Sequence, residues 1–453
     1  MPNFNINEII KATGGIATKV IATEFSDIST DSRKILPNSI FLALVGENFN
    51  GHNFIDLAIE KGATCIIANK KEYIDSQLNV TIITVDNTLE AYQKIACCYR
   101  RRFDIPVIAI TGSNGKTTTK DLTASVLSSK YNVHKTNANF NNEIGLPFTL
   151  LQLHQEHDVA VVEMGMRGIG HIKDLMNIAE PNIGVVTNVG ETHMELLGSI
   201  DNIAQAKGEL VEDIPESGLV ILNADDEHVK KMAHKTKAKV IFFGIDNDAD
   251  VKAFNIKYFE TNTLFDFSYG GKIYKCKLPL VGKHNVYNAL AAIAVGLDMK
   301  LTVEEIQKGL DKLSLSAMRL AVMKIKGYTF INDAYNASPM SMKAAIESLN
   351  TIAAKRKIAV LGDMLELGSI SAEAHRKIGD ILADNNIDMV ITLGEQAKNI
   401  SDQARRSGIS EVYEAKDHEE IKNILKLNLQ TGDTVLLKGS RGMKMEKTLE
   451  GLF

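Results

Sequence analysis

One segment constrains the fold of this chain more than any other: a glycine-rich turn between an apolar run and a helical pattern. The apolar run covers residues 107–110, and the helical pattern extends from Lys116 to about Ser129. The segment itself is Thr111, Gly112, Ser113, Asn114, Gly115, Lys116, Thr117, Thr118 and Thr119. A strand, a glycine turn and a helix start bind nucleotide phosphates, because glycines let backbone N–H groups approach phosphate oxygens and the helix adds the positive end of its dipole.

Lys116 and Thr117 add the side chains that a phosphate site needs. The lysine can reach the outer phosphates, and the threonine hydroxyl can ligate Mg²⁺. The match to the common P-loop pattern is incomplete, because the first glycine of that pattern would fall at Ile110. An ordinary glycine turn before a helix is the alternative, and the Lys-Thr pair in this context argues against it. The segment therefore predicts a site for a nucleotide and Mg²⁺.

Size and composition limit the class of protein. The 453 residues are enough for roughly three domains. The chain is 45% hydrophobic and 24% charged, as in soluble globular proteins. The net charge of −5, with no long basic run, argues against a nucleic-acid partner. We find no signal peptide and no apolar run long enough for a membrane span, so we expect no membrane partner.

The number and spacing of the cysteines indicate the cellular compartment of the protein. They are Cys65, Cys97, Cys98 and Cys276. Their spacing is not that of a metal site, and such sparse use of cysteine suits a reducing environment. We therefore expect a cytoplasmic protein.

Changes in pattern divide the chain into three parts. A basic cluster at residues 100–102 precedes Pro106, and a new pattern begins after Leu313. These changes predict domains at residues 1–103, 104–314 and 315–453.

The middle part alternates apolar runs with helical patterns, which is typical of a parallel sheet with crossover helices. The strands predicted there are Val107–Ile110, Val159–Glu163, Ile183–Asn188, Leu219–Asn223 and Val240–Phe243. Residues 258–280 alternate in an aromatic-rich pattern that favours antiparallel strands, and residues 285–297 predict an alanine-rich helix. Beyond residue 313 the pattern predicts a hairpin at 321–325 and 329–332, then strands at 358–361, 389–393 and 434–437.

Two side chains follow strands of the predicted middle sheet. Glu163 ends the second strand, and His193 lies shortly after the third. In open α/β sheets, ligands bind beyond the carboxyl ends of the strands. A carboxylate and an imidazole beside a nucleotide loop suit Mg²⁺ and phosphoryl transfer. A lone glutamate at a strand end is usually solvated, but its combination with His193 and the Lys116-Thr117 pair favours a site.

Lys207 lies on the apolar face of a predicted helix. It is seven residues after Ile200, four after Ile203 and four before Val211, which are all apolar. This spacing predicts that the lysine faces inward. Buried lysines are rare unless they are paired or chemically changed. On position alone, a lysine whose stem packs while its ammonium reaches water is the favoured interpretation.

Several motifs, taken together and in order, resemble those of the Mur ligases, the ATP-dependent amide-forming enzymes of peptidoglycan precursor synthesis. Besides the glycine-rich segment, they are N-x-x-N-x-I-G-x-P at residues 139–147, N-V-G-x-x-H-x-E at 188–195, A-K-G-E at 206–209 and G-K-H-N-V-x-N-A-L-A-A at 282–292. The resemblance covers nearly the whole chain. It implies an α/β fold of three domains: a small α/β N-terminal domain that holds the uridine nucleotide, a central P-loop-type domain with a mostly parallel sheet that binds ATP, and a C-terminal Rossmann-like domain.

Other motifs narrow the branch of the family. Residues 29–33 and 46–52 resemble the uridine-binding N-terminal domain of the later-acting ligases. Residues 333–339, 361–368 and 438–441 are similar to the branch that adds D-alanyl-D-alanine to UDP-N-acetylmuramoyl-tripeptide. The family usually has asparagine at the position of Ser338. The D-N-P-R-like segment of the diaminopimelate- and lysine-adding relative is missing. The sequence does not predict whether the third peptide residue is lysine or diaminopimelate.

The resemblance also implies roles for individual residues. The implied ATP-binding residues are Gly112, Ser113, Asn114, Gly115, Lys116, Thr117, Thr118, Asn288, Arg319 and Asp333. The implied ligands of two Mg²⁺ ions are Thr117, Glu163, His193 and Lys207, and Lys207 would be carbamylated to supply an anionic oxygen. The implied catalytic residues are Lys116, His193, Lys207 and Arg319. The implied substrate-binding residues are Ser29, Asp31, Ser32, Arg33, Asn48, Asn139, Asn142, Asn336, Lys438, Ser440 and Arg441.

Some alternatives stay open. Without the family, Asn288 could be a helix-surface amide and Asp333 a turn residue. The separate roles of Lys438, Ser440 and Arg441 are not predicted. Four other functions remain possible for the whole chain: another amino-acid-adding Mur ligase, a folylpolyglutamate synthase, a small-molecule kinase or a nucleotide-dependent switch. The uridine-type segments argue against the folate enzyme, and a switch would not need His193 and an inward Lys207. We expect a monomer.

Overall fold

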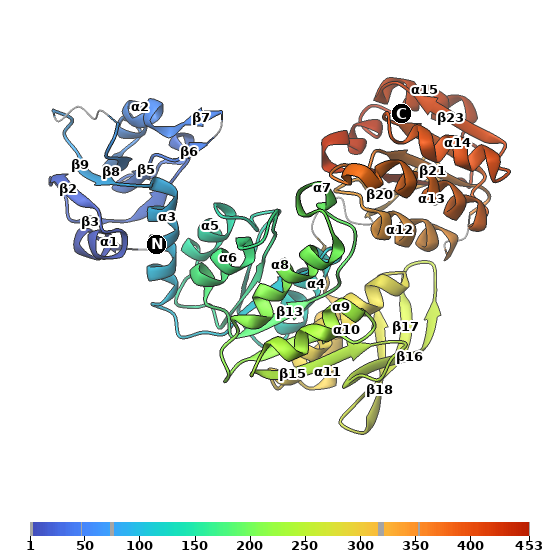
Figure 1. Ribbon diagram of the computed structural model, residues 1–453, viewed down its shortest axis with the longest axis horizontal. Helices are drawn as coiled ribbons and strands as arrows, with labels where there is room; N and C mark the ends of the chain where they lie inside the picture. Colours follow the sequence, from blue (N-terminus) through green and yellow to red (C-terminus); the bar gives the residue numbers. More distant parts are fainter. Residues whose placement is uncertain (1–2, 47, 73–76, 316–320, 352–353, 453) are drawn as a thin grey trace. The chain divides into compact units, whose positions relative to one another are not determined.

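The computed structural model describes residues 3–46, 48–72, 77–315, 321–351 and 354–452 (Figure 1). Arg319 lies outside these residues. The chain forms two compact units. The first consists of residues 1–107, 132–164 and 173–181, and the second of residues 108–131, 165–172 and 182–453.

The first unit contains a small α/β sheet built from the N-terminal residues. In hydrogen-bonded order, its described strands are β2 (Ile16–Lys19), β9 (Thr81–Val85), β8 (Ala63–Asn69), β5 (Ser39–Leu42) and β4 (Asp27–Ser29). Only β2 runs antiparallel to its neighbour among these strands. Ile55 and Ala58 of α2 (Ile55–Glu60) pack against Phe41 and Ile66 of the sheet. The side chain of Asn87 caps α3 (Thr88–Arg100) at its start.

The remaining elements of the first unit surround this sheet or follow it in the chain. They are α1 (Ile6–Thr13), the antiparallel pair β1 (Phe4–Asn5) and β3 (Glu24–Phe25), the hairpin β6 (Val45–Gly46) and β7 (Phe49–Asn50), the parallel pair β11 (Val133–Lys135) and β12 (Val159–Glu163), and α5 (Gly145–Leu151). The helix α6 (His171–Ala179) has residues in both units.

The second unit carries the predicted central sheet. From β10 onward, the described strands of this sheet are, in order, β10 (Val107–Thr111), β13 (Ile183–Val186), β14 (Leu219–Asn223), β15 (Lys239–Gly244), β16 (Val251–Tyr258), β17 (Thr263–Tyr269) and β18 (Lys272–Leu278). Strands β10 to β16 pair in parallel, and β16 to β18 pair antiparallel. Every residue of β10 and β14 is buried, as expected for strands covered on both faces.

Helices α4 (Lys116–Leu127), α10 (Lys283–Asp298) and α11 (Val303–Asp311) pack against one another. A Cβ atom added at Gly309 would lie 2.5 Å from the Cα atom of Val126, so the glycine allows α11 to approach α4 closely. Residues 289–294 of α10 are all buried, which explains the alanine-rich pattern. The helix extends two residues before and one residue after the predicted range of 285–297. Helices α8 (Ile200–Glu212) and α9 (Glu227–Lys231) contact β13 and β14, respectively.

The C-terminal part of the second unit is Rossmann-like. Its described strands, in order, are β19 (Ala321–Ile325), β20 (Tyr328–Asp333), β24 (Thr434–Lys438), β21 (Lys357–Gly362), β22 (Met389–Leu393) and β23 (Glu411–Ala415). One face packs against α12 (Pro339–Thr351), α13 (Ser371–Asp384) and α14 (Lys398–Arg406), and the other against α15 (His418–Asn428). The hairpin β19–β20 is antiparallel, and the other pairs are parallel.

The observed fold confirms the predicted class of three α/β domains with a mostly parallel central sheet, while the predicted domain limits stay a prediction. The sequence patterns missed β11, β16 and β23. The predicted strand over residues 183–188 ends earlier, at Val186, because the next residues form a loop that binds the glycine-rich segment. In the described part of the chain, no helix has the length and apolar composition that a membrane crossing requires.

Candidate active site

Residues 112–115, between β10 and α4, form a loop whose shape requires glycine at two positions. Gly112 has φ +150° and Gly115 has φ +80°. A Cβ atom added at Gly112 would lie 1.9 Å from Oγ1 of Thr187, and one added at Gly115 would lie 2.4 Å from Oδ1 of Asn288. Both contacts are too short for any side chain, so the loop backbone lies directly against its neighbours. We call residues 112–115 the phosphate loop.

A second loop, at residues 187–192 after β13, supports the phosphate loop. The Asn114 backbone N–H donates to Oδ1 of Asn188 (2.8 Å), and its carbonyl accepts from Oγ1 of Thr187 (2.6 Å). The Ser113 hydroxyl lies within hydrogen-bond distance of both the N–H and the carbonyl of Gly190 (2.9 and 3.0 Å). These bonds fix the shape of the phosphate loop, which is the kind of preorganisation that a phosphate site needs.

Lys116 begins α4 and folds back over the loop. Its Nζ donates to the carbonyls of Gly112 (2.7 Å) and Ser113 (3.3 Å). Thr117 follows it as a buried residue in the first turn, and Thr118 is half-buried. The ammonium group and the threonine hydroxyl therefore lie at the start of one helix, as the sequence predicted.

Asn288 lies beneath the same loop. It is buried, and its Oδ1 accepts from Oγ1 of Thr119 (3.2 Å), while its Nδ2 donates to Oδ1 of Asn285 (3.2 Å). The alternative of a helix-surface amide is therefore wrong. The amide supports the start of α4 and fills the space that Gly115 leaves.

Lys207 is buried in α8, with only 2% of the residue exposed. The structure therefore confirms the predicted inward orientation, and the interpretation favoured on position alone, an ammonium group in water, is wrong. Among the described residues, Lys207 has no hydrogen-bond or ion-pair partner. Burial holds the pKa of its amine well below the usual range, and the positive charge of Lys116 lowers it further. A buried amine with a lowered pKa loses its proton more readily than an exposed one, so the position suits chemical modification.

His193 lies at the end of the supporting loop, in a left-handed conformation with φ +57°, just before the short helix α7 (Met194–Leu197). Its Nδ1 is 2.6 Å from Oε2 of Glu366, a short ion-pair contact without the geometry of a hydrogen bond. His193 holds the pKa of Glu366 below its usual range. The Glu195 N–H donates to the Glu366 carbonyl (3.1 Å). The sequence patterns did not single out Glu366, because its partner is 173 positions away in the chain.

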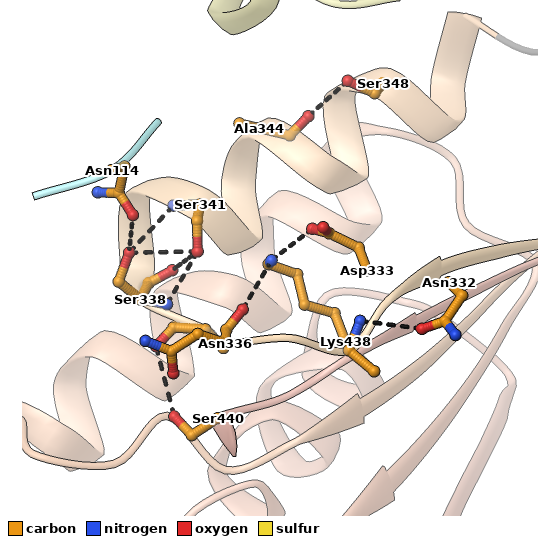
Figure 2. Close-up of polar contacts among 12 residues, drawn as sticks. Asn114, Asn332, Asp333, Asn336, Ser338, Ser341, Ala344, Ser348, Lys438 and Ser440 are labelled. Carbon is orange, nitrogen blue, oxygen red and sulfur yellow. Dashed lines mark hydrogen bonds and ion pairs between the residues drawn. The ribbon is translucent and has the colours of Figure 1, made fainter. Parts of the chain in front are cut away.

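Asp333 and the residues of the 438–441 segment come together in the C-terminal domain (Figure 2). Nζ of Lys438 donates to Oδ2 of Asp333 (2.5 Å) and to the carbonyl of Asn336 (3.0 Å). The Arg441 N–H donates to Oδ1 of Asn336 (3.4 Å), and the Ser440 hydroxyl donates to the carbonyl of Ala337 (3.4 Å). Lys438 is buried, so its charge is compensated by Asp333 and is not available on the surface.

Glu163 belongs to the first unit, at the end of β12. It is 2% exposed, and its Oε1 accepts from Nδ2 of Asn141 (2.8 Å). Its Oε2 is buried and has no hydrogen-bond partner among the residues that the structure describes. Asn141 was missed in the sequence, although it lies between the predicted Asn139 and Asn142. These two asparagines are exposed, and Oδ1 of Asn142 accepts from the Gly145 N–H at the start of α5 (2.9 Å).

The predicted uridine contacts at residues 29–33 form one turn of the N-terminal domain. Asp31 caps the turn η1 (Ser32–Lys34) and pairs with the guanidinium of Arg33 (2.8 Å), which lowers the pKa of Asp31 to about 2. The Ser29 hydroxyl accepts from the Asp31 N–H (3.1 Å). Ser32 is buried, and Asn48 lies exposed between β6 and β7.

The donor set fits Mg²⁺ only together with a phosphate ligand. In the described part of the chain, no group of three His, Cys, Asp or Glu side chains could hold a metal ion alone. Mg²⁺ commonly binds through one or two carboxylates, with water and substrate phosphates completing its shell. The unpartnered oxygen of Glu163 and the hydroxyl of Thr117 are ligands of that kind.

Comparisons with known proteins agree over the whole chain. Three family descriptions match: "Mur ligase family, catalytic domain" at residues 24–100, "Mur ligase middle domain" at 110–296 and "Mur ligase, glutamate ligase domain" at 318–441. The UDP-N-acetylmuramoyl-tripeptide--D-alanyl-D-alanine ligase of Bacillus subtilis (strain 168) is 39% identical over 99% of this chain and 97% of its own length.

Solved structures give the same result. MurF from Acinetobacter baumannii is 30% identical with a TM-score of 0.92, covering 100% of this chain and 99% of that one. MurF from Thermotoga maritima in complex with ADP is also 30% identical, with a TM-score of 0.85 over 94% of this chain and 96% of that one. The likeness in sequence and fold extends over both units, and the chain belongs to the Mur ligase family.

Proposed function

We propose that this Mur ligase joins D-alanyl-D-alanine to UDP-N-acetylmuramoyl-tripeptide and converts ATP to ADP and phosphate. The observation that carries this proposal is the end-to-end similarity to relatives named for that reaction, at 39% identity over 99% of the chain. The loop geometry supports the ATP part, because hydrogen bonds from residues 187 and 188 fix the backbone of the phosphate loop. The four described cysteines form no disulfide, which supports a cytoplasmic location.

The chemistry runs in two steps. A carboxylate is a poor electrophile, so its oxygen first attacks the γ-phosphorus of ATP, giving an acyl phosphate and ADP. The amine of D-alanyl-D-alanine then attacks the acyl carbon, and the tetrahedral intermediate expels phosphate and loses a proton. The main task of the protein is to neutralise charge on the transferring group while holding the reactants in line.

Lys116 is suited to the first step. Its Nζ already lies over the phosphate loop, where it donates to two backbone carbonyls. A phosphate oxygen accepts from an ammonium group more strongly than a carbonyl does. We infer that Nζ leaves these carbonyls for the outer phosphates when ATP binds.

We further propose two Mg²⁺ ions, which when bound would neutralise charge on the phosphates. Thr117 and Glu163 would hold the first, and the free Oε2 of Glu163 supports this role. His193 and a carbamate on Lys207 would hold the second. The burial and the lowered pKa of the Lys207 amine support the carbamate, because an amine that has lost its proton adds CO₂ and releases one further proton.

The remaining assignments are also proposals. Ser29, Asp31, Ser32, Arg33 and Asn48 would bind the uridine end, and Asn139 and Asn142 the region of the reacting peptide. Asn336, Lys438, Ser440 and Arg441 would orient the incoming dipeptide. The ATP contacts would be Gly112, Ser113, Asn114, Gly115, Lys116, Thr117, Thr118, Asn288, Arg319 and Asp333. We propose that the protein acts as a monomer, without a nucleic-acid or membrane partner.

The test is the dependence of ADP release on both substrates. With ATP and Mg²⁺, the purified protein should release ADP only when the UDP-linked tripeptide and D-alanyl-D-alanine are both present, and mass spectrometry should detect the pentapeptide product. Lysine and diaminopimelate forms of the tripeptide are compared in parallel. Ligation of a single amino acid to a shorter muramyl peptide would identify another Mur ligase instead. ADP release with an alcohol acceptor would identify a kinase.

A further inference from the structure

The first turn of α12 reaches the phosphate loop through one buried hydroxyl. Ser338 immediately precedes α12 and is 5% exposed. Its hydroxyl donates to Oδ1 of Asn114 in the phosphate loop, at 2.8 Å (Figure 2). The two residues are 224 positions apart in the chain. The contact therefore joins the nucleotide-binding loop to the C-terminal domain.

Local structure fixes the direction of this hydroxyl. The Ser341 N–H donates to Oγ of Ser338 (3.3 Å), and the Ser338 N–H donates to Oγ of Ser341 (2.9 Å). This is the reciprocal pattern of a capping box, with Pro339 at the first helical position where proline is favoured. The single proton of Ser338 has two acceptors within reach, Oδ1 of Asn114 at 2.8 Å and Oγ of Ser341 at 3.2 Å, and the shorter bond directs it to Asn114.

A second contact comes from the same turn. Sδ of Met340 lies 3.6 Å from Nδ2 of Asn114, and a Cβ atom added at Gly190 would lie 2.9 Å from Cε of Met340. Both polar ends of the Asn114 side chain are thus engaged by α12, while its backbone is engaged by residues 187 and 188. The orientation of Asn114 depends on the C-terminal domain as well as on the central sheet.

The segment before Ser338 is tied to the proposed amine-side residues. The Ser440 hydroxyl donates to the Ala337 carbonyl and accepts from the Leu365 N–H (2.8 Å). Leu365 precedes Glu366, which contacts His193. Hydrogen bonds and short stretches of backbone therefore connect the phosphate loop, through Ser338, to Ser440 and to the contact between Glu366 and His193.

We propose that Ser338 is a positioning residue: its hydroxyl fixes Asn114, and through it the phosphate loop, so that the γ-phosphate is aligned only when the start of α12 is in place. The proposal rests on the proposed ATP-dependent ligation, since the loop is taken as the phosphate site. Loss of the hydroxyl should therefore affect ATP, while the affinity for the dipeptide should remain unchanged.

The test compares two substitutions at one position. Ser338→Gly removes the hydroxyl but keeps a residue that starts helices almost as well. Losing one buried hydrogen bond corresponds to about a tenfold effect on kcat/KM for ATP. We therefore expect a lower kcat and a higher KM for ATP, which together lower kcat/KM by about that factor. KM for D-alanyl-D-alanine should not change. Ser338→Asn keeps both an acceptor for Ser341 and a donor for Asn114, and it should retain activity within about threefold of wild type.

Two controls separate positioning from helix capping. Thr302→Gly breaks the capping box of α11, which lies outside the site, and should lower thermal stability only slightly, without changing kcat or KM for ATP. In a double-mutant cycle, Ser338→Gly combined with Asn114→Ala should lose no more activity than the worse single variant, because both remove the same bond. ADP affinity, measured by calorimetry for each variant, gives a readout that does not require turnover.

The outcomes are distinct. Wild-type kcat and KM for ATP in Ser338→Gly, or additive losses in the cycle, would overturn the proposal. An equal kinetic loss in Thr302→Gly would also overturn it, because helix stability alone would then explain the effect. If the wild-type protein forms no amide with any muramyl peptide, the proposed function fails, and the ADP affinities still decide the role of Ser338.

Discussion

At the scale of single residues, Lys207 is the most unusual side chain of the protein. Its amine is buried, where ammonium groups are rare, and burial holds the pKa of that amine well below the usual range. If the amine carries a carbamate, Lys207→Ala should lose most ligase activity, and small carboxylates in solution should restore part of it. The measurement is turnover with and without acetate, with thermal unfolding as the control for folding. Wild-type turnover in Lys207→Ala would contradict the carbamate.

Lys116 gives a second prediction at this scale. Lys116→Ala removes the positive charge over the phosphate loop and should reduce kcat by about 10²-fold or more, because preorganised charge acts on the transferring phosphoryl group. The matched control is Lys272→Ala, an exposed lysine of β18, which should leave kcat unchanged. Both are measured as ADP release in the complete reaction. ATP-dependent ligation at the wild-type rate in Lys116→Ala would mean that the loop has another purpose.

At the scale of elements, the loop from β21 to α13 depends on a neutral histidine. His375 is fully buried, its Nδ1 donates to the Ser371 carbonyl (2.7 Å) and its Nε2 accepts from the Met364 N–H (2.9 Å). A protonated ring could not accept that N–H, and burial lowers the pKa of His375 below its ordinary value of 6.5. The loop carries Glu366 to His193, so its integrity matters for the site.

The sign of the pH effect follows from this lowered pKa. As pH falls below about 6.5, the His375 side chain takes up a proton in the unfolded chain but stays neutral in the folded chain. The contribution of His375 to the unfolding free energy is therefore present at pH 7–8 and lost towards pH 5. His375→Gln should therefore be less stable than wild type by about 1 kcal/mol at pH 7.5, and the gap should close towards pH 5. Urea unfolding at several pH values measures it, with exposed His234→Gln as control. If the difference in unfolding free energy between wild type and His375→Gln stays constant with pH, the neutral histidine is not the source of the stability.

The sequence predicted elements best where the pattern is local. The run at residues 107–110 followed by Gly112, Gly115 and Lys116 predicted a strand, a loop and a helix, and the spacing around Lys207 predicted that it faces inward, although not that its amine is buried. Contacts between distant segments were not predictable. Nothing in local periodicity indicates that Ser338 donates to Asn114 or that Glu366 meets His193, because these pairs are formed by tertiary packing. Short edge strands such as β23 were also not predicted, because their residues are only partly buried and give a weak apolar pattern.

At the scale of the whole molecule, the proposed reaction uses residues from all three domains. The proposed uridine contacts lie at residues 29–33, the phosphate loop at 112–115 and the proposed dipeptide contacts at 336–441. Each group alone could serve a binding protein. Only a reaction that uses a nucleotide-linked carboxylate, ATP and an amine requires all of them in one chain.

The central claim is that the carboxylate is activated as an acyl phosphate, and oxygen-18 tests it directly. The UDP-linked tripeptide is labelled in the reacting carboxylate and incubated with ATP, Mg²⁺ and D-alanyl-D-alanine. The account predicts that each amide formed releases one phosphate carrying one labelled oxygen, because the carboxylate oxygen that attacked the γ-phosphorus leaves with it. Amide formation with only unlabelled phosphate would contradict the acyl-phosphate route.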